Sequence, residues 1–584
     1  MKIRFPARGF AACALGHPRT ATSRAPSNDV RRRRISSLEH IPSAKDQADS
    51  PARVARLPRG AHRPPGAGRP RLRQRFERAA ATRAAAIAAF GGLLAISLAF
   101  KARGLGSAYW IDEGLSVGIG SHPFFDIPGL LVQDGSPPLY YMLLHVWMGW
   151  FGTSEFATQS LSAVFGLLCV PAAFWAGNVM MDRRAAWAAA ALAAVNPFLT
   201  LHSYEARMYA LMILLGILAS TAFVLAYVQD RRRWAPVFGV LVALMLYTHN
   251  WALFFGAACA VAFAWLWRCA PVAARRPLLR DGAIGFGVTA LLYAPWLPTL
   301  ASQAKHTGAP WSIRPMFDEL IFGTGVTIGG RGPSVALALA AGVALSAMAA
   351  QRRTRDLRTV QTLLIVFAGT ALIAFAASQI SPAWASRYLA VVLGPLLLFA
   401  AVTLVNAERL GLWALAIFIT ICALPQPVHL TDSGDEKVVA QEVKAYLQPG
   451  DLVLLTHPER VPIMRHYLGP QFRYGDLFGP VKDTGLMDWR DALERMKKVR
   501  ITTNLEPQLA TVPLHGHVAL VRPIVDKKSN SWDAPWTHRV AIFSRHWARA
   551  LNRDRRFRPV KGAPFPYAQL KFGVRAVVYE RVRQ

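Results

Sequence analysis

The sequence predicts an α-helical polytopic membrane protein that ends in a small extracytoplasmic α/β domain. Apolar residues make up 53% of the 584 residues and charged residues only 17%, and the mean hydropathy is +0.25. Soluble chains carry about 25% charged residues, so this composition disfavours a soluble enzyme and excludes a wholly disordered chain. Long apolar segments recur between residues 81 and 429, and the composition becomes ordinary after residue 430.

Residues 1–80 form a basic arm without an apolar core. They hold 19 basic and 5 acidic residues, including the run Arg31 to Arg34. This composition is typical of disorder, and the apolar stretch 9–16 is a poor signal-peptide core. The whole chain has a net charge of +33. Because its centre is so apolar, we expect anionic membrane lipid, and no nucleic acid, as the partner of this charge.

Eleven membrane-spanning helices are predicted in the domain 81–429, because each apolar segment approaches the ~20 residues that cross a bilayer. Every second break between the spans is rich in arginine, so these breaks should all face the cytoplasm, and the basic amino-terminal arm should face the same side. This parity requires that segment 137–151 does not cross, so we expect an interfacial helix there with Tyr140, Tyr141, Trp147 and Trp150 as anchors. The predicted spans are 83–100, 157–180, 185–201, 207–228, 234–249, 251–267, 282–300, 333–350, 359–380, 387–405 and 409–427.

Residues 430–584 should then lie outside the cytoplasm as a small α/β domain. The five cysteines of the chain show no paired spacing, so neither a disulfide framework nor a zinc site is expected. The expected strands of the domain are 451–456, 518–521 and 575–582, and the expected helices are 436–447, 486–499 and 541–553.

The sharpest chemical signal is WIDEGLS, residues 110–116, where Asp112 and Glu113 follow the first span. Ionised groups so close to hydrocarbon are costly unless they are partnered or functional. Either carboxylate could take a proton from an acceptor hydroxyl, or could bind a divalent cation. The alternative is that Asp112 or Glu113 only caps the next helix.

Asp134 offers a second carboxylate in the same outer loop, two residues before Ser136. Taken alone, Asp134 or Ser136 is an ordinary cap for a helix opened by proline. If Asp134 faces Asp112, however, the two would form a site for a metal ion or a sugar hydroxyl. Asp112 and Asp134 are therefore the candidate ligands of a possible divalent cation.

The segment 204–209, at the outer end of a span, holds four candidate residues. Tyr204 and Arg207 are three apart, and Glu205 and Tyr209 are four apart, so each pair can share a helix face. The forked guanidinium of Arg207 suits a phosphodiester. The alternative is an interfacial aromatic belt with Arg207 as a snorkelling anchor.

Further candidates lie at other outer helix ends. Arg387, followed by Tyr388, is either a second phosphate ligand or a snorkelling anchor. His249 is more typical of a satisfied interfacial histidine than of a catalyst. Lys305 and His306 belong to the outer loop 301–332, whose length suggests a lid over a substrate site.

A non-enzymatic transporter of lipid-linked or envelope glycans is the alternative from another functional class. It would need ionisable residues at mid-depth in the spans, and many transporters also have repeated halves. The predicted spans are almost bare of ionisable groups, and no internal repeat is found. Both observations favour chemistry at one membrane surface.

These motifs resemble the membrane glycosyltransferases of the GT-C fold. They are most similar to the dolichyl-phosphate-mannose protein mannosyltransferase superfamily, which includes bacterial lipid A aminoarabinose transferases and lipopolysaccharide-core sugar transferases. The resemblance covers roughly residues 100–405 and implies one span, two interfacial helices and then the other spans. The segments that match in order are WIDEGLS, DGSPPLYYMLLHVWMGWFG, SEFATQSLSAVFGLL, NPFLTLHSYEARMYAL and ASRYLAVVLGPLLL.

The resemblance implies an inverting transferase that moves a hexosyl or pentosyl unit from a polyprenyl-phosphate sugar. The acceptor would be a lipid, a glycan such as a polysaccharide, or a protein of the cell envelope, at the outer face of the inner membrane. Asp112 matches the catalytic carboxylate, Glu113 its neighbour and Asp134 the second acidic position. Arg207 and Arg387 match basic positions near the lipid phosphate.

Two further expectations come from the same resemblance. Tyr209 and Tyr388, which accompany the two arginines, would help to bind the donor phosphate. Gln159 departs from the pattern, because relatives commonly carry arginine at that position.

Overall fold

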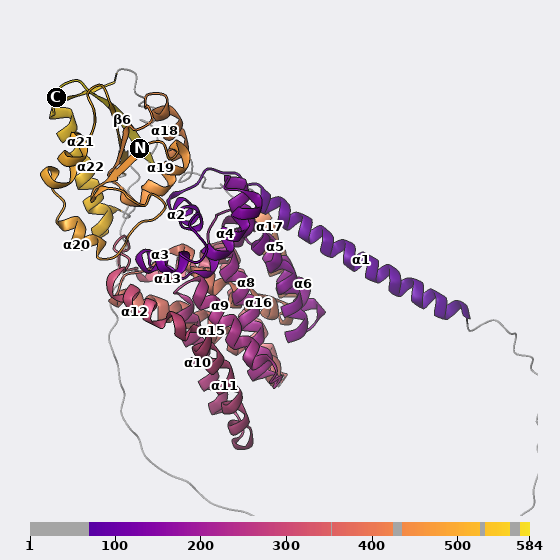
Figure 1. The fold of residues 1–584 in the computed structure, drawn as a ribbon. Coiled ribbons are helices and arrows are strands. Elements are labelled where there is room, and N and C mark those ends of the chain that lie inside the picture. Colours follow the sequence, from indigo (N-terminus) through magenta and orange to yellow (C-terminus); the bar gives the residue numbers. More distant parts are fainter. Residues whose placement is uncertain (1–68, 352, 424–434, 526–531, 561–572) are drawn as a thin grey trace, which may run out of the picture. The chain divides into compact units, whose positions relative to one another are not determined.

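The computed structural model describes residues 69–351, 353–423, 435–525, 532–560 and 573–584 (Figure 1). The predicted disorder of residues 1–68 lies outside the described residues. Helix α1 runs from Arg69 to Ala102, so residues 69–80, which the sequence assigned to the arm, are helical.

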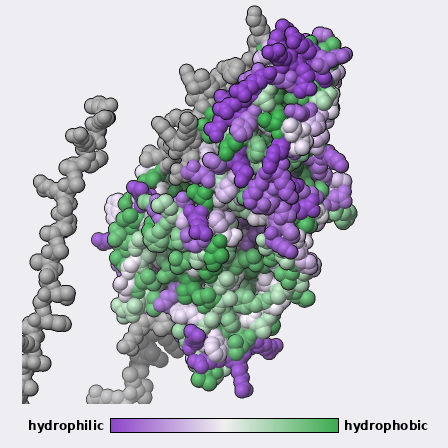
Figure 2. Space-filling model, turned by 90° about the vertical axis from the view of Figure 1, so that its left-hand side faces the viewer, coloured by the Kyte–Doolittle hydropathy of each residue, from purple (hydrophilic) through white to green (hydrophobic). Residues whose placement is uncertain are grey.

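Eight helical segments among the described residues are long and apolar enough to cross a membrane, as expected of a multipass membrane protein. Their residues are apolar on most sides, and Figure 2 shows hydrophobic residues covering the helical part of the molecule. The segments are Thr82–Ala102, Glu155–Met180, Tyr209–Val228, Ala252–Cys269, Val272–His306, Arg331–Ala350, Arg355–Ile380 and Ser386–Asn406.

Three of the eleven predicted spans are shorter helices. Segment 185–201 consists of α6 (Arg183–Val195) and α7 (Pro197–Leu201), which are separated at Asn196. Asn196 caps α7 by accepting the Leu199 N–H at 2.7 Å. The other two are α9 (Trp234–Thr248) and α17 (Glu408–Ala423), while residues 424–427 lie outside the described residues. Helices of 13 to 16 residues reach about 20–24 Å, so helix length alone does not confirm eleven crossings.

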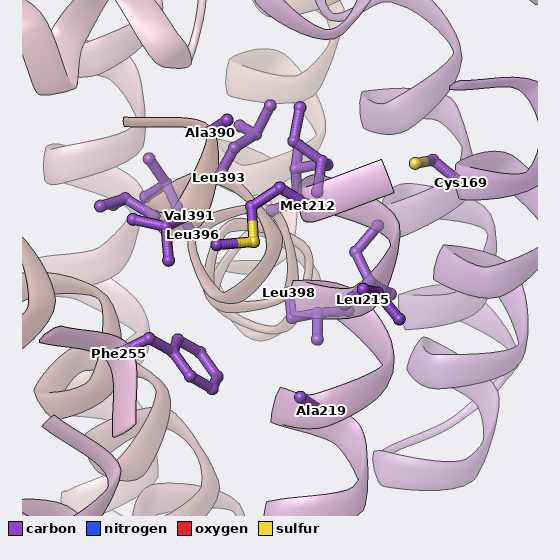
Figure 3. Packing of buried hydrophobic residues seen from close by; sticks show 14 of the residues in the cluster. Cys169, Met212, Leu215, Ala219, Phe255, Ala390, Val391, Leu393, Leu396 and Leu398 are labelled. Carbon is purple, nitrogen blue, oxygen red and sulfur yellow. The ribbon is translucent and has the colours of Figure 1, made fainter. Parts of the chain in front are cut away.

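Two central helices, α8 (Tyr209–Phe223) and α16 (Ala390–Asn406), hold the core of the bundle together. Each of the two spans that contain these helices, Tyr209–Val228 and Ser386–Asn406, has 89% of its most apolar stretch buried. A Cβ atom added at Gly394 would lie 2.6 Å from the carbonyl carbon of Gly216, so the two backbones touch. Close approach through small residues is the usual packing device within membranes. Figure 3 shows Met212 and Leu215 of α8 interleaved with side chains of α16.

The remaining helices surround this pair, and their bounds follow the predicted apolar segments. They are α5 (Glu155–Met180), α10 (Ala252–Cys269), α11 (Val272–Tyr293), α12 (Leu297–His306), α13 (Phe317–Thr327), α14 (Arg331–Ala350) and α15 (Thr354–Ile380).

The segment between α1 and α5 contains three short helices: α2 (Ile111–Gly120), α3 (Ile127–Asp134) and α4 (Leu139–Phe151). Helix α4 corresponds to the predicted interfacial helix 137–151. Trp150 is 73% exposed, as an interfacial anchor should be, but Tyr140 and Tyr141 are buried. The anchoring role expected of these two tyrosines is therefore wrong, because the Tyr140 hydroxyl is hydrogen-bonded to Ser162 of α5 and the Tyr141 hydroxyl accepts from Arg207.

The carboxyl-terminal residues fold into an α/β domain, as predicted, around a six-stranded sheet of order β3-β2-β1-β4-β6-β5. Strand β1 is parallel to β2 and β4, and the other neighbouring pairs are antiparallel. The strands are β1 (Leu452–Leu455), β2 (Arg473–Asp476), β3 (Gly479–Pro480), β4 (His517–Pro523), β5 (Phe557–Pro559) and β6 (Val574–Arg581). The helices are α18 (Asp435–Lys444), α19 (Val461–Leu468), α20 (Ala492–Lys497), α21 (Glu506–Ala510) and α22 (Pro535–Arg553).

Candidate active site

Helix α2 is part of the helical region of the chain and also packs against the carboxyl-terminal domain. Leu115 joins the apolar core of that domain, beside residues such as Trp536. A Cβ atom at Gly114 would lie 2.6 Å from the Ile463 Cβ, and one at Gly118 would lie 2.3 Å from the Gly485 carbonyl oxygen. Only glycine fits at these two contacts, so the domain fixes the position of α2 and of Asp112 in its first turn.

Two arginines converge on one carboxylate oxygen of Asp112. The Arg387 Nη2 atom lies 3.4 Å from Asp112 Oδ2, and the Arg207 Nη2 atom lies 3.9 Å from the same oxygen. Charge-assisted hydrogen bonds are shorter, at about 2.7–2.9 Å. Asp112 therefore acts as a loose counter-ion of both arginines, and the structure brings together three of the candidate residues that the sequence put forward.

The packing of α8 against α16 explains why the arginines meet. Arg207 lies two residues before α8, and Arg387 lies in a 3₁₀ turn, Ser386–Leu389, directly before α16. Because the two helices touch at Gly216 and Gly394, their amino-terminal ends bring both guanidinium groups to the same place.

Arg207 is only 8% exposed and is held by several polar atoms. Its Nη1 atom donates to the Asp112 carbonyl oxygen at 3.2 Å, to Ser116 Oγ at 3.0 Å and to Tyr141 Oη at 3.4 Å. The guanidinium carbon also lies 5.7 Å from the centre of the Tyr209 ring. A buried, fixed guanidinium of this kind is preorganised for an anion.

Arg387 lies among three aromatic rings. Its guanidinium carbon is 5.3 Å from the ring centres of Trp110, Trp311 and Tyr388. Trp311 comes from residues 307–316, which link α12 to α13 and are called the strap below. Cation–π contacts within about 6 Å favour a cation that has lost part of its hydration. The three rings thus hold Arg387 next to Asp112.

Three donor groups at this place have no hydrogen-bond partner among the described residues. They are the Nε atoms of Arg207 and Arg387 and the indole nitrogen of Trp110, all of them buried. Buried donors are nearly always paired in folded proteins. Two positive charges and three free donors around a single carboxylate form a site that can take a second anion.

Glu113 is buried away from solvent, at 2% exposure. Its Oε1 atom accepts the Ala206 N–H at 2.7 Å and the Gln159 side-chain N–H at 3.1 Å, and its Oε2 atom accepts the Trp110 N–H at 3.2 Å. It therefore ties α2 to α5 and to the backbone beside Arg207. This geometry makes Glu113 a positioning residue. Gln159, which stands where relatives commonly carry arginine, helps to hold the Glu113 carboxylate in place.

Burial raises the pKa of Glu113 to about 8 from its ordinary value of 4.5, against the opposing effect of the three donated hydrogen bonds. The folded chain then keeps a proton that the unfolded chain releases above pH 4.5. The contribution of Glu113 to stability is therefore present at low pH and is lost as the pH rises towards 8, at up to about 1.4 kcal/mol per pH unit.

We expect Glu113→Gln to flatten the fall in thermal stability between pH 5 and pH 8, because an amide cannot release a proton. The measurement is the unfolding midpoint in detergent over this pH range, compared with the wild type. Asp126→Asn, which neutralises an exposed carboxylate in the same loop, should leave the wild-type pH dependence in place. Parallel curves for Glu113→Gln and the wild type would contradict the assignment.

Asp134, at the end of α3, lies near the same site. Burial raises the pKa of its carboxyl, while hydrogen bonding from Ser136 and the charge of Arg207 act in the opposite direction, and Asp112 also acts on it. In the described part of the chain, no group of three or more histidine, cysteine or acidic side chains could hold a metal ion. The two guanidinium groups already supply positive charge next to Asp112, and a divalent cation bound by Asp112 and Asp134 stays a prediction.

The other aromatic and histidine candidates occupy the walls of the site or lie behind it. The His249 ring lies 4.6 Å from the Tyr388 ring and 6.2 Å from the Tyr209 ring, and its Nδ1 accepts the Trp251 N–H at 3.1 Å. His249 therefore lies in the wall of the site with its Nδ1 atom hydrogen-bonded. The sequence favoured such a hydrogen-bonded histidine over a catalyst at this helix end.

Tyr204 and Glu205 lie behind the site. The Tyr204 ring packs so closely against Gly104 that a Cβ atom there would lie 2.3 Å from it. Glu205 pairs with His202 Nδ1 at 2.7 Å. The structure does not bring either residue to the arginines.

Lys305 and His306 are not at the arginines either. His306 Nδ1 lies 3.2 Å from the Asp491 carboxylate of the carboxyl-terminal domain, and its carbonyl oxygen accepts the Asp491 N–H at 2.7 Å. Lys305 is exposed. The expected outer loop 301–332 is partly helical, and the residue it brings to the site is Trp311.

Four residues around the arginines were not assigned to the site from the sequence: Trp110, Ser116, Tyr141 and Trp311. Ser116 lies four residues after Asp112 on α2, and its Oγ donates to the Asp112 carbonyl oxygen at 2.9 Å, so helical spacing could have found it. Nothing in the sequence pairs Trp311 or Tyr141 with an arginine, because only the tertiary fold brings them together.

No protein-family description and no curated protein matches the sequence. Among solved structures, the chain is similar to ArnT from Cupriavidus metallidurans in the apo state, with a TM-score of 0.54 and 14% identity over 85% of this chain and 98% of that one. The same ArnT bound to undecaprenyl phosphate gives a TM-score of 0.55 and 14% identity over 84% of this chain and 97% of that one. Identity at this level shows the fold alone, and it confirms the GT-C fold that the motifs implied.

Proposed function

We propose that this chain is a membrane glycosyltransferase that moves a sugar from a polyprenyl-phosphate donor to an acceptor of the cell envelope, at the outer face of the inner membrane. The observation that carries the proposal is the convergence of Arg207 and Arg387 on Asp112, at 3.9 and 3.4 Å. A structure of the same fold has been solved with undecaprenyl phosphate bound, which supports a lipid phosphate as the ligand of such a site.

The two arginines bind the phosphate that leaves. In this proposal the phosphate of the bound donor takes the position beside the arginines that the Asp112 carboxylate occupies in this structure. The unpaired Nε atoms of both arginines can donate to it. The phosphate therefore competes with Asp112 for the guanidinium groups. Charge stabilisation by preplaced cations is commonly the largest catalytic term, worth several kcal/mol.

Asp112, once released from the arginines, faces the acceptor. The acceptor oxygen attacks the anomeric carbon while the bond from that carbon to the phosphate oxygen breaks, and polyprenyl phosphate leaves with the electron pair. The hydroxyl proton passes to the Asp112 carboxylate and then to water. Attack opposite to the leaving group inverts the configuration, and the transferred unit would be a hexosyl or pentosyl group.

Asp134 and Glu113 have other roles in this proposal. Asp134 lies near Arg207 and Asp112 and would accept a hydrogen bond from a sugar hydroxyl. Glu113 holds the Ala206 N–H next to Arg207 and so fixes the arginine without touching the substrate. No step requires a metal ion, because the guanidinium groups balance the phosphate.

Mass spectrometry of envelope glycans from a deletion strain tests this function whichever sugar is transferred. We expect one glycan to lose the mass of a single sugar unit, and the wild-type gene to restore it. Complementation with Asp126→Asn, which alters an exposed carboxylate outside the site, should restore it as well. A glycan that keeps its mass but fails to reach the outer surface would indicate a transporter instead.

A further inference from the structure

The exposed face of α22 carries a row of arginines that the proposed chemistry does not use. Arg545, Arg549 and Arg553 follow one another at intervals of four residues, and Arg555 continues the row past the helix end. All four are exposed, and side chains four apart on a helix lie about 5–6 Å from each other. These four residues are called the arginine row.

The charge of this row is not neutralised. Residues 535–558 hold seven arginines and one acidic residue, Asp554. Asp554 pairs with Arg556 at 2.8 Å, and none of the row forms an ion pair with any residue in the part of the chain that the structure describes. Like charges held this close repel one another, so an anionic partner that lies along the row gains from all four.

A water-soluble partner fits this helix better than a bilayer does, because α22 has no fully exposed large apolar side chain. Its apolar face, which includes Trp536, Trp547 and Leu551, is buried in the core of the domain. Interfacial helices instead insert apolar side chains into the membrane. In Figure 2, which looks onto the side where α20 to α22 lie in Figure 1, hydrophilic residues gather over this domain.

The amino end of α22 lies next to the candidate active site. The Trp536 N–H donates to the Pro310 carbonyl oxygen at 3.1 Å, and the next residue of the strap, Trp311, stacks on Arg387. A cavity of about 330 Å³ opens here between strap residues, Asp491 and Pro535. A long ligand on the row can therefore extend past the start of α22 towards the reacting groups.

We propose that the arginine row docks the acceptor, and that the acceptor is a polyanionic glycan with several phosphate, sulfate or carboxylate groups. The role of this glycan as the acceptor rests on the proposed function, whereas its binding to the arginine row does not. An extended glycan fits a row of evenly spaced charges that spans more than one helical turn, and it needs no apolar pocket.

The test uses the full chain in nanodiscs of zwitterionic lipid, with a heparin octasaccharide as the polyanionic probe and a neutral dextran of equal length as the control ligand. We expect the triple variant Arg545→Gln, Arg549→Gln, Arg553→Gln to lose at least tenfold in heparin affinity. The matched control Lys444→Gln, Lys482→Gln, Arg575→Gln removes three exposed charges from the same domain and should lose less than threefold.

Equal losses in the two triple variants would overturn the proposal, since the row would then act only through the overall charge of the domain. Unchanged heparin binding would overturn it too. The proposal would also be overturned if the row variant kept its heparin affinity but no longer bound vesicles of anionic phospholipid. That result would assign the row to the membrane surface. Undecaprenyl phosphate binding, measured on the same samples, separates the two proposals: if the wild type does not bind it, the proposed function fails, whatever the heparin result.

Discussion

Asp112→Asn is expected to reduce sugar transfer by about 10²–10⁴-fold while it tightens the binding of undecaprenyl phosphate. The first effect follows from the loss of the proton acceptor, which contributes factors of this size in general base catalysis. The second follows from the geometry, because Asp112 Oδ2 lies 3.4 and 3.9 Å from the two guanidinium groups and competes with the phosphate for them. Asparagine keeps the shape of the side chain and removes the competing charge.

Both effects are measured on protein in nanodiscs, by turnover of a labelled polyprenyl-phosphate sugar and by titration with undecaprenyl phosphate. Asp126→Asn, which lies in the same loop but is exposed, serves as the matched control and should change neither. Weaker phosphate binding by Asp112→Asn would contradict the competition between carboxylate and phosphate. Undiminished turnover with intact expression would remove Asp112 from the mechanism.

Arg387→Ala is expected to weaken the binding of undecaprenyl phosphate by about 10–100-fold. A hydrogen bond to a charged group is worth about 1.5–3 kcal/mol, which corresponds to this range. Arg387→Lys should fall between the wild type and Arg387→Ala, because lysine keeps the charge but loses the fork and the stacking against Trp110, Trp311 and Tyr388.

Arg314→Ala provides the control for this series, since Arg314 is an exposed arginine of the strap. Its phosphate affinity should match that of the wild type. If Arg387→Ala bound undecaprenyl phosphate as tightly as Arg314→Ala, Arg387 would be only an anchor at the membrane surface, the alternative that the sequence left open.

Charge and hydropathy singled out three candidate residues that the structure brings together. Asp112, Arg207 and Arg387 stand out because ionised groups are rare beside apolar segments. Their contact could not be derived in the same way, because the two arginines are far apart in the sequence. It depends on the close approach of α8 and α16 at Gly216 and Gly394, which no local pattern reveals.

The two acidic neighbours in WIDEGLS illustrate a second limit. Adjacent residues on a helix point in different directions, so Asp112 faces the arginines while Glu113 is buried against α5 and the Ala206 N–H. The sequence alone could not tell which carboxylate faces the site. In the carboxyl-terminal domain the longest strands, β4 and β6, were found, whereas β2, β3 and β5 have only four, two and three residues and are too short for a periodic signal.

A structure of the chain with undecaprenyl phosphate, determined by electron cryomicroscopy in nanodiscs, tests the central claim most directly. The account predicts that the phosphate lies between Arg207 and Arg387 within hydrogen-bond distance of both, and that the Asp112 carboxylate has moved away from the two guanidinium groups. A phosphate bound elsewhere, with both contacts of Asp112 intact, would contradict it.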